Sequence, residues 1–400
     1  MSRIKDLFLA HVGQTSDMPV MLEVSHAQGV YIYDTDGKRY IDMNSGISVS
    51  SLGHCHPEVV AAIQRQSSSY MHTMVYGEHV QAPQVEFAEM LLDAMLGDYD
   101  SVYYLSAGTE ATELSIKLAK KYTGRHEVIA MKNSYHGSTL GAESLRSDLS
   151  YTSAFMPMMP GVKHIDFNQI EALDHITQNT GGVICEVVKG EEGVIKADLT
   201  YLQHLRKRCD EVGAMLIFDE IQSGFGRTGS LFAHEVYKVY PDVVLIGKAM
   251  GGGMPISGVV TSRDILGAIV RDPALGHIST FGGHPVCCAA ATASLKVLLE
   301  TSLIDQVKEK ESLIVRKLSQ HSIIKEVRSS GLMMAVEPIR RKYLKHIVSR
   351  AIELGVIVDW FLFNNRSFRL APPLIASTDE LEEGCDLLLA AMDYAEGLYT

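Results

Sequence analysis

The sequence predicts an α/β protein with a large domain on a mostly parallel sheet and a smaller α+β domain. Between residues 102 and 261, short continuous apolar runs alternate with glycine-bearing loops and helical stretches. This alternation is typical of parallel strands that are covered by helices on both faces. The runs are VYYL (102–105), VIAM (128–131), VICEVV (183–188), MLIFD (215–219), VVLIG (243–247) and ISGVVT (256–261).

Two flanking regions have a different pattern. Residues 30–42 alternate in polarity around Asp36-Gly37, which predicts a β-hairpin. Beyond residue 286, one or two amphipathic helices precede a mixture of strands and helices. A chain of 400 residues favours two domains. We expect an N-terminal segment over 1–45 that joins the small domain, a large domain over 46–285 and the small domain over 286–400.

Composition and charge argue against several classes of function. The formal net charge of −12 disfavours nucleic acid as the main partner, because the phosphate backbone calls for clustered Lys and Arg. The six cysteines contain no C-x-x-C, and their spacing suits neither a disulfide framework nor a zinc site, so we expect reduced thiols in a cytoplasmic protein. We see no secretory signal and no apolar stretch of about 18 residues, so we expect no transmembrane helix.

The first candidate site residues follow two of the predicted strands. Gly108 and Thr109 open a helical pattern, where free N–H groups and the helix dipole would bind an anion. After the next strand, Tyr135 could cover the face of a flat ligand, and His136 could hydrogen-bond or transfer a proton. The alternatives are a plain strand-to-helix turn with a threonine cap and a structural Tyr-His pair.

Two charged residues end later apolar strands. Asp219 ends MLIFD, and a buried carboxylate is costly unless a cationic or hydrogen-bonding partner meets it. Lys248 follows VVLIG and precedes three glycines. Loss of hydration would lower the pKa of such a lysine and make its neutral amine a nucleophile that can form a Schiff base. The alternative is a surface lysine beside a flexible loop.

A single ligand would give each of these residues a separate task. An aromatic aldehyde phosphate with a pyridine nitrogen meets the requirement, and that molecule is pyridoxal 5'-phosphate (PLP). Asp219 would accept a hydrogen bond from the pyridinium N–H, which offsets the cost of burying its carboxylate. Gln222 would hydrogen-bond the ring hydroxyl. Gly108 and Thr109 would bind the phosphate, Tyr135 would stack on the ring, and Lys248 would react with the aldehyde.

The chain resembles the class III aminotransferases of fold type I, the group of acetylornithine, ornithine and 4-aminobutyrate aminotransferases. The most specific match is IFDEIQSGFGRTG with PDVVLIGKAMGGG, and the resemblance extends from YIYDTDGKRYIDMNSGISVSSLGHCHPEV to FRLAPPL. It implies a PLP enzyme with a mostly parallel, seven-stranded sheet in its large domain. It also implies a homodimer with active sites at the interface, in which Thr280, next to Ser279 in STFGGHP, reaches the cofactor phosphate of the partner subunit.

The resemblance assigns three further charged residues. The family segment E-P-V-Q-G-E-G-G reads EVVKGEEGV here, so Glu186, expected at the cofactor, and Glu191 match its two glutamates. In relatives the second glutamate can pair with a late arginine and swing away when an α-carboxylate arrives, and that arginine matches Arg369 in FRLAPPL. A free arginine clamps a carboxylate, whereas a neutralised one tolerates an uncharged chain. The alternative for Arg369 alone is a surface salt bridge.

The residues together predict transamination by a ping-pong route, in which Lys248 moves the proton of the substrate carbon and 2-oxoglutarate or pyruvate accepts the amino group. Acetylornithine and ornithine enzymes have a motif similar to F-H/W-G-R-T where this chain has YHGST. Ser138 stands at the arginine position and cannot replace its bidentate carboxylate contact. This favours an ω-amine or a 4-aminobutyrate-like donor over acetylornithine. We expect Ser138, Tyr76 and Ser279 to contact substrate. An aminomutase or decarboxylase of the same fold, or a non-catalytic PLP-binding relative, stays an alternative.

Overall fold

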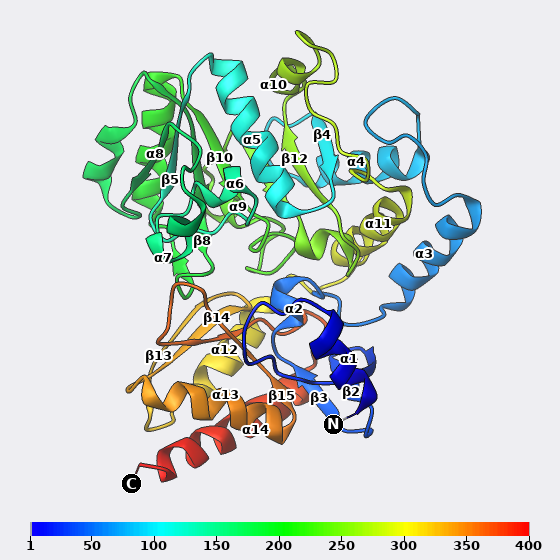
Figure 1. Ribbon diagram of the computed structural model, residues 1–400, viewed down its shortest axis with the longest axis vertical. Helices are drawn as coiled ribbons and strands as arrows, with labels where there is room; N and C mark the ends of the chain where they lie inside the picture. Colours follow the sequence, from blue (N-terminus) through cyan, green and yellow to red (C-terminus); the bar gives the residue numbers. More distant parts are fainter. Residues whose placement is uncertain (1, 400) are drawn as a thin grey trace.

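The computed structural model describes residues 2–399, which form a large and a small lobe stacked along the long axis of the molecule (Figure 1). The large lobe is built on a seven-stranded sheet in the order β4-β12-β11-β10-β7-β5-β6. Strand β12 runs antiparallel to both of its neighbours, and the other pairings are parallel. The predicted mostly parallel sheet is therefore confirmed. Its strands are β4 (Ser101–Leu105), β5 (Glu127–Met131), β6 (Val162–Ile165), β7 (Thr180–Glu186), β10 (Met215–Asp219), β11 (Val243–Ile246) and β12 (Ser257–Thr261).

Both faces of this sheet are buried, which explains its continuous apolar runs. Along β10, Ile217 packs with helix α5 on one face, and Phe218 packs with helix α8 on the other. Near β11 and β12, helices α4 and α11 cover the sheet, and α3 packs on α11. These helices are α3 (Pro57–Ser69), α4 (Ala82–Ala94), α5 (Gly108–Thr123), α8 (Leu199–Val212) and α11 (Pro285–Glu300).

The small lobe contains two four-stranded sheets. The first joins β13 (Ile324–Ser330), β14 (Met333–Pro338), β17 (Phe368–Leu370) and β16 (Asp359–Trp360). The second joins β1 (Val24–Gln28), β2 (Tyr31–Asp34), β3 (Arg39–Asp42) and β15 (Val356–Ile357). Strands β2 and β3 form the hairpin predicted around Asp36-Gly37, and β3 pairs in parallel with the late strand β15. The N-terminal strands thus share a sheet with the C-terminal part of the chain, while the boundaries at residues 45 and 285 stay a prediction.

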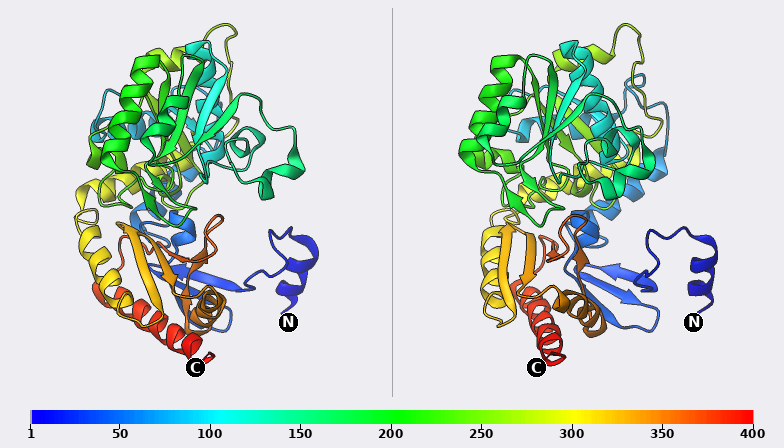
Figure 2. Two further views of the ribbon diagram at one scale, coloured as in Figure 1. Left: turned by 90° about the vertical axis from the view of Figure 1, so that its left-hand side faces the viewer. Right: turned by 60° about the vertical axis from the view of Figure 1, so that its left-hand side comes forward.

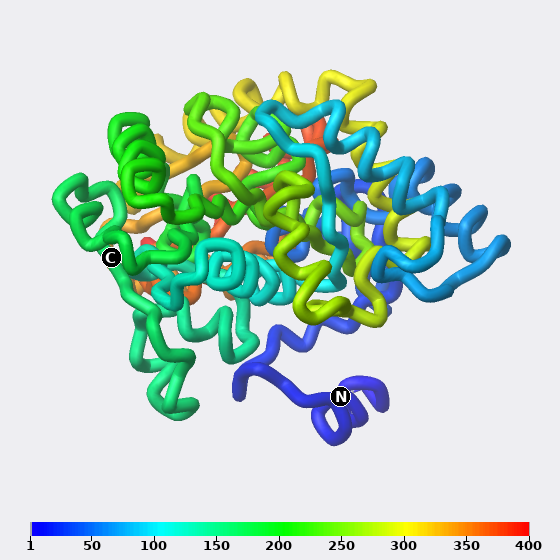
Figure 3. Tube along the Cα trace, turned by 90° about the horizontal axis from the view of Figure 1, so that it is seen from above, coloured from blue at the N-terminus to red at the C-terminus, as the bar shows by residue number. Residues whose placement is uncertain are grey.

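Three helices complete the small lobe, and one helix stands apart from it. Helices α12 (Val307–Leu318), α13 (Lys342–Leu354) and α14 (Thr378–Gly397) contribute apolar residues to a core that the two lobes share. Helix α1 (Arg3–His11) lies away from the body of the molecule, as Figures 2 and 3 show. Within this described helix no residue is buried.

Short elements connect these parts. The hairpin of β8 (Val188–Lys189) and β9 (Ile195–Lys196) follows β7. Short helices and 3-10 turns are α2 (Ser45–Ser48), α6 (Leu140–Glu143), α7 (Leu149–Thr152), α9 (Ala233–Tyr237), α10 (Arg263–Leu266), η1 (Ser153–Phe155), η2 (Ile170–His175), η3 (Lys248–Gly251) and η4 (Gly267–Ile269). All six cysteines carry free thiols. Among residues 2–399, no helix combines the length and the apolar character needed to cross a bilayer.

Candidate active site

The carboxyl ends of β4, β5, β7, β10 and β11 meet around one cavity of about 490 Å³. Parallel strands bring their carboxyl ends to the same edge of a sheet, so residues that are far apart in sequence converge there. Most of the residues predicted to hold the cofactor lie on its wall. The predicted residues in the wall are Gly108, Thr109, Tyr135, His136, Ser138, Glu186, Asp219, Gln222 and Lys248.

The N-terminus of α5, where an anion site was predicted, lies on the wall of this cavity. Helix α5 begins at Gly108 after Ala107, whose methyl side chain cannot cap the first N–H groups. Thr109 presents a hydroxyl that contacts the Thr139 hydroxyl at 2.7 Å. A neighbouring glycine, Gly137, has φ +130°, and a Cβ there would overlap the Thr109 side chain. The backbone at Gly137 therefore packs closely against Thr109, and the two segments form a cradle at the start of α5.

The wall of this cavity also contains a buried acidic centre. Asp219 Oδ2 lies 2.7 Å from His136 Nδ1, and Asp219 Oδ1 accepts a hydrogen bond from the Ile221 N–H at 3.0 Å. Burial alone would lower the pKa of His136, but its bond to Asp219 and the charges of Asp219 and Glu186 outweigh this and raise the pKa above its usual 6.5. Asp219 therefore has an imidazole partner within the protein, a contact that the strand pattern did not predict.

Glu186 ends β7 beside this pair. Its carboxylate accepts hydrogen bonds from the backbone N–H groups of Tyr135 at 3.2 Å and Gly190 at 3.1 Å. Burial, reinforced by the charge of Asp219, raises the pKa of Glu186 to about 7, although nearby His136 acts in the opposite direction. Burial therefore favours the protonated form of Glu186.

Lys248 begins η3, two positions after the last residue of β11, on a wall that the 490 Å³ cavity shares with a second cavity of about 830 Å³. Its backbone has φ +47°, in the left-handed region. Burial lowers the pKa of the Lys248 ammonium, and the charge of Arg369 lowers it further, while Glu191 and Asp219 oppose the change. The direction of this shift is the one that the sequence predicted for Lys248.

The second cavity contains an ion pair between the two lobes. Arg369, on β17, places Nη2 2.6 Å from each carboxylate oxygen of Glu191, in the β8–β9 turn. Glu191 Oε2 also accepts the Leu362 N–H at 3.0 Å. The Arg369 guanidinium lies 4.7 Å from the centroid of the Phe361 ring. Within residues 2–399, Arg369 Nε and Nη1 are buried and lack a hydrogen-bond partner. The pair is therefore buried rather than the surface salt bridge that was the alternative.

Comparison with known proteins identifies the family. A model of the family described as aminotransferase class-III matches residues 12–392. The chain belongs to the class III aminotransferase family. It is 38% identical over 387 residues to the acetylornithine aminotransferase of Methanocaldococcus jannaschii, covering 94% of this chain and 93% of that relative. It is 36% identical over 379 residues to ornithine aminotransferase 1 of Staphylococcus aureus strain COL, covering 91% and 93% of the two chains.

A solved structure gives the same assignment. The ornithine aminotransferase of Toxoplasma gondii superposes with a TM-score of 0.90 at 28% identity, over 98% of this chain and 95% of that one. Another structure of that enzyme is described as having partial occupancy of PLP at its active site. This class III aminotransferase is therefore a PLP-dependent enzyme of fold type I.

The cavity of this class III aminotransferase fits PLP by its own chemistry. The uncapped start of α5 and the cradle at Gly137 suit a phosphate. Asp219, with its His136 partner, offers a carboxylate to a ring N–H, and Lys248 offers an amine to the aldehyde. Gln222 lies against Gly190, where an added Cβ would overlap its amide. Val188 and Ile221 add apolar walls that were not predicted as site residues, although both lie within the motifs EVVKGEEGV and IFDEIQSGFGRTG.

Three predicted residues lie outside both cavities. Thr280 is exposed, and the Ser279 hydroxyl donates to Glu110 at 3.4 Å. Tyr76 is half-buried in the loop before α4. The reach of Thr280 into a partner subunit, and the substrate contacts of Ser279 and Tyr76, stay predictions.

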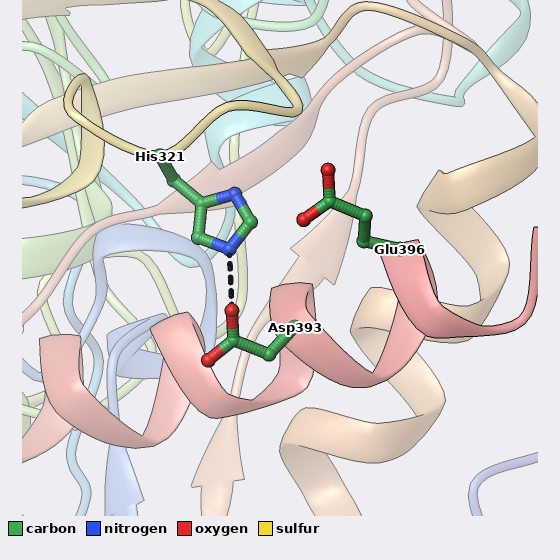
Figure 4. A group of neighbouring side chains, drawn as sticks. All are labelled: His321, Asp393 and Glu396. Atoms are coloured by element: carbon green, nitrogen blue, oxygen red, sulfur yellow. Dashed lines mark hydrogen bonds and ion pairs between the residues drawn. The ribbon is translucent and has the colours of Figure 1, made fainter. Parts of the chain in front are cut away.

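A three-residue group in the small lobe has the side chains of a metal site, but it is held by ordinary contacts. His321 Nε2 lies 3.1 Å from Asp393 Oδ1, and Glu396 lies beside them (Figure 4). The Ser322 hydroxyl donates to Glu396 at 2.9 Å, and the Asp393 side chain is 77% exposed. A surface ion pair with a neighbouring hydrogen bond accounts for this group.

Proposed function

We propose that this enzyme transfers an amino group from an ω-amine or an amino acid donor to a keto acid such as 2-oxoglutarate or pyruvate. The mechanism is ping-pong, so the carbonyl product of the donor leaves before the keto acid binds. The observation that carries the proposal is the Arg369–Glu191 pair on the same cavity wall as Lys248. Two substrates that differ in the group beside the reacting carbon need a cation that can be either exposed or neutralised.

PLP supplies an electron sink and a carbonyl for exchange when it is bound. Lys248 Nζ, with its lowered pKa, takes the proton from the substrate carbon. Asp219, supported by His136 at 2.7 Å, would keep the ring nitrogen of the cofactor protonated. Arg369 binds the carboxylate beside the reacting carbon of the keto acid after Glu191 turns away, and Glu191 neutralises Arg369 when the donor lacks that group.

The donor proposal rests on two observations. The relatives are named for acetylornithine and ornithine, and ornithine has an amine at the end of its chain. Ser138 carries no charge at the cavity wall, which supports donors without an arginine clamp at that position.

The experiment is a screen of amines against a fixed acceptor. Purified holoenzyme is incubated with terminal amines or amino acids, with 2-oxoglutarate, with pyruvate, or with no acceptor, and both products are measured. We expect amino acid product only when a donor and a keto acid are both present. A carbonyl or rearranged product that forms catalytically without any acceptor would overturn transamination in favour of an aminomutase or a decarboxylase.

We also propose a homodimer in the cytoplasm. An exposed Thr280 that lies outside the cavity of its own chain supports a role across an interface. Light scattering measures the molar mass in solution and so shows whether the protein is a dimer. Thr280→Val is expected to weaken PLP binding by about tenfold, the loss of one phosphate hydrogen bond. A monomeric active enzyme would refute the proposal.

A further inference from the structure

A second buried arginine lies close to the active-site tyrosine. Arg146 follows α6 and is only 7% exposed. Its guanidinium carbon lies 5.1 Å from the centroid of the Tyr135 ring, 4.6 Å from that of Tyr151 and 5.4 Å from that of Phe363. Three aromatic faces hold the cation in position and keep water from much of its surface.

The ionic contact of Arg146 leaves one buried nitrogen of the guanidinium, Nε, without a hydrogen-bond partner among residues 2–399. Nη1 lies 3.1 Å from Glu143 Oε1, and Glu143 is itself 5% exposed. A guanidinium has five N–H donors, and leaving a buried charged donor unpaired is unfavourable. A second carboxylate would supply the missing acceptor.

The arginine faces a cavity that adjoins the PLP cavity. This cavity of about 300 Å³ is lined by Ser138, Leu140, Glu143, Arg146, Tyr151 and Phe155. Ser138 also lines the 490 Å³ cavity, and its hydroxyl lies 3.3 Å from the Tyr135 hydroxyl. The residue between the two spaces is therefore small and uncharged, and a substrate arm that passes Ser138 would meet the Arg146 cation.

We propose that Arg146 binds the substrate carboxylate that lies farthest from the reacting carbon. This inference rests on the proposed function and defines its substrate class as keto acids with two carboxylates and donors with a carboxylate remote from the amine. Arg369 serves the carboxylate beside the reacting carbon, and Arg146 serves the distal one. Glu143 neutralises Arg146 when no distal carboxylate is present, as Glu191 does for Arg369.

The kinetic test compares two acceptors that share the keto acid end. 2-Oxoglutarate has a distal carboxylate and pyruvate has none. For Arg146→Met, we expect the ratio of kcat/KM for 2-oxoglutarate to kcat/KM for pyruvate to fall on the order of 10- to 100-fold. Arg146→Lys should restore part of the ratio, because lysine keeps the positive charge but lacks the planar guanidinium that binds a carboxylate with two N–H groups.

A matched control separates recognition from packing. Arg350 also pairs with a glutamate three residues away, Glu353 at 2.8 Å, and its guanidinium carbon lies 5.0 Å from the centroid of the Tyr394 ring, but it lies on α13. Arg350→Met should leave the ratio as in the wild type. If Arg146→Met lowers kcat/KM for both acceptors equally, Arg146 is structural and the proposal is wrong.

A binding measurement keeps this inference independent of turnover. Glutarate, a dicarboxylate without a keto group, is titrated calorimetrically into wild-type and Arg146→Met holoenzyme, with butyrate as the one-carboxylate reference. We expect glutarate to bind the variant at least tenfold more weakly, with a smaller change for butyrate. Equal glutarate affinities would overturn the role of Arg146. Absence of amino transfer by the wild type would instead overturn the proposed function, while the glutarate comparison would still decide the role of Arg146.

Discussion

Replacement of Arg369 by methionine isolates a buried negative charge between the two lobes. The variant leaves the Glu191 carboxylate, which is 5% exposed, with the Leu362 N–H at 3.0 Å as its remaining hydrogen bond. Removing one partner of a buried ion pair costs about 3–5 kcal/mol, because the other charge stays desolvated. Glu191→Leu should cost a similar amount, since Arg369 is 2% exposed and its next carboxylate, Asp359, lies 3.9 Å from Nη1.

The double variant decides whether the two residues act as one unit. Arg369→Met and Glu191→Leu together remove both charges, so no buried charge of this pair stays unpaired, and apolar side chains fill the space. We therefore expect the double variant to be more stable than either single variant, with a coupling free energy of about 2–3 kcal/mol.

The assay is unfolding by urea of the four proteins at one saturating PLP concentration, followed by circular dichroism and intrinsic fluorescence. Arg350→Met serves as a control, because its partner Glu353 is 64% exposed and a surface pair contributes about 0–1 kcal/mol. In parallel, Arg369→Met should raise KM for the keto acid on the order of 10- to 100-fold. A double variant whose loss of stability equals the sum of the two single losses would refute the reasoning.

Three further predictions follow from the site. Because burial raises the pKa of Glu186 from its ordinary 4.5 to about 7, ionisation disfavours the folded state, so the free energy of unfolding should fall as pH rises from about 5 to 7, by an amount on the order of 3 kcal/mol. Glu186→Gln should remove that fall in unfolding measured across pH, and an unchanged slope would contradict the assignment. Lys248→Ala should still bind PLP, as seen by absorbance, but lose at least about 10²-fold in kcat, so full activity would exclude Lys248 as the base. Gly137→Ala should weaken PLP binding in a fluorescence titration by about tenfold or more, since its Cβ would overlap Thr109, while Gly124→Ala, also at positive φ but with nothing within 4 Å, should not; equal affinities would rule out the cradle.

Sequence pattern brought most of the predicted cofactor residues to one cavity wall, because their positions depend on local features. Asp219 and Lys248 each follow an apolar run, and a parallel sheet brings the ends of such runs to one edge. Gly108 and Thr109 were found in the same way, from a strand that leads into a helix. The sequence could not predict that β12 runs antiparallel to its neighbours. A continuous apolar run such as ISGVVT is compatible with either a parallel or an antiparallel strand.

The sequence by itself determined which residues are buried at strand ends and which ligand chemistry they suit, because burial and periodicity are encoded within a few neighbouring residues. Only the tertiary structure decided the partners of the charged groups. His136 meets Asp219 across 83 positions of the chain, and Arg369 meets Glu191 across 178, a pair that only the family resemblance had suggested. The surroundings of Arg146 depend likewise on Phe363, from the other lobe. Such pairings arise from packing between elements distant in the chain, and a distance in space of a few ångströms leaves no local pattern in the sequence.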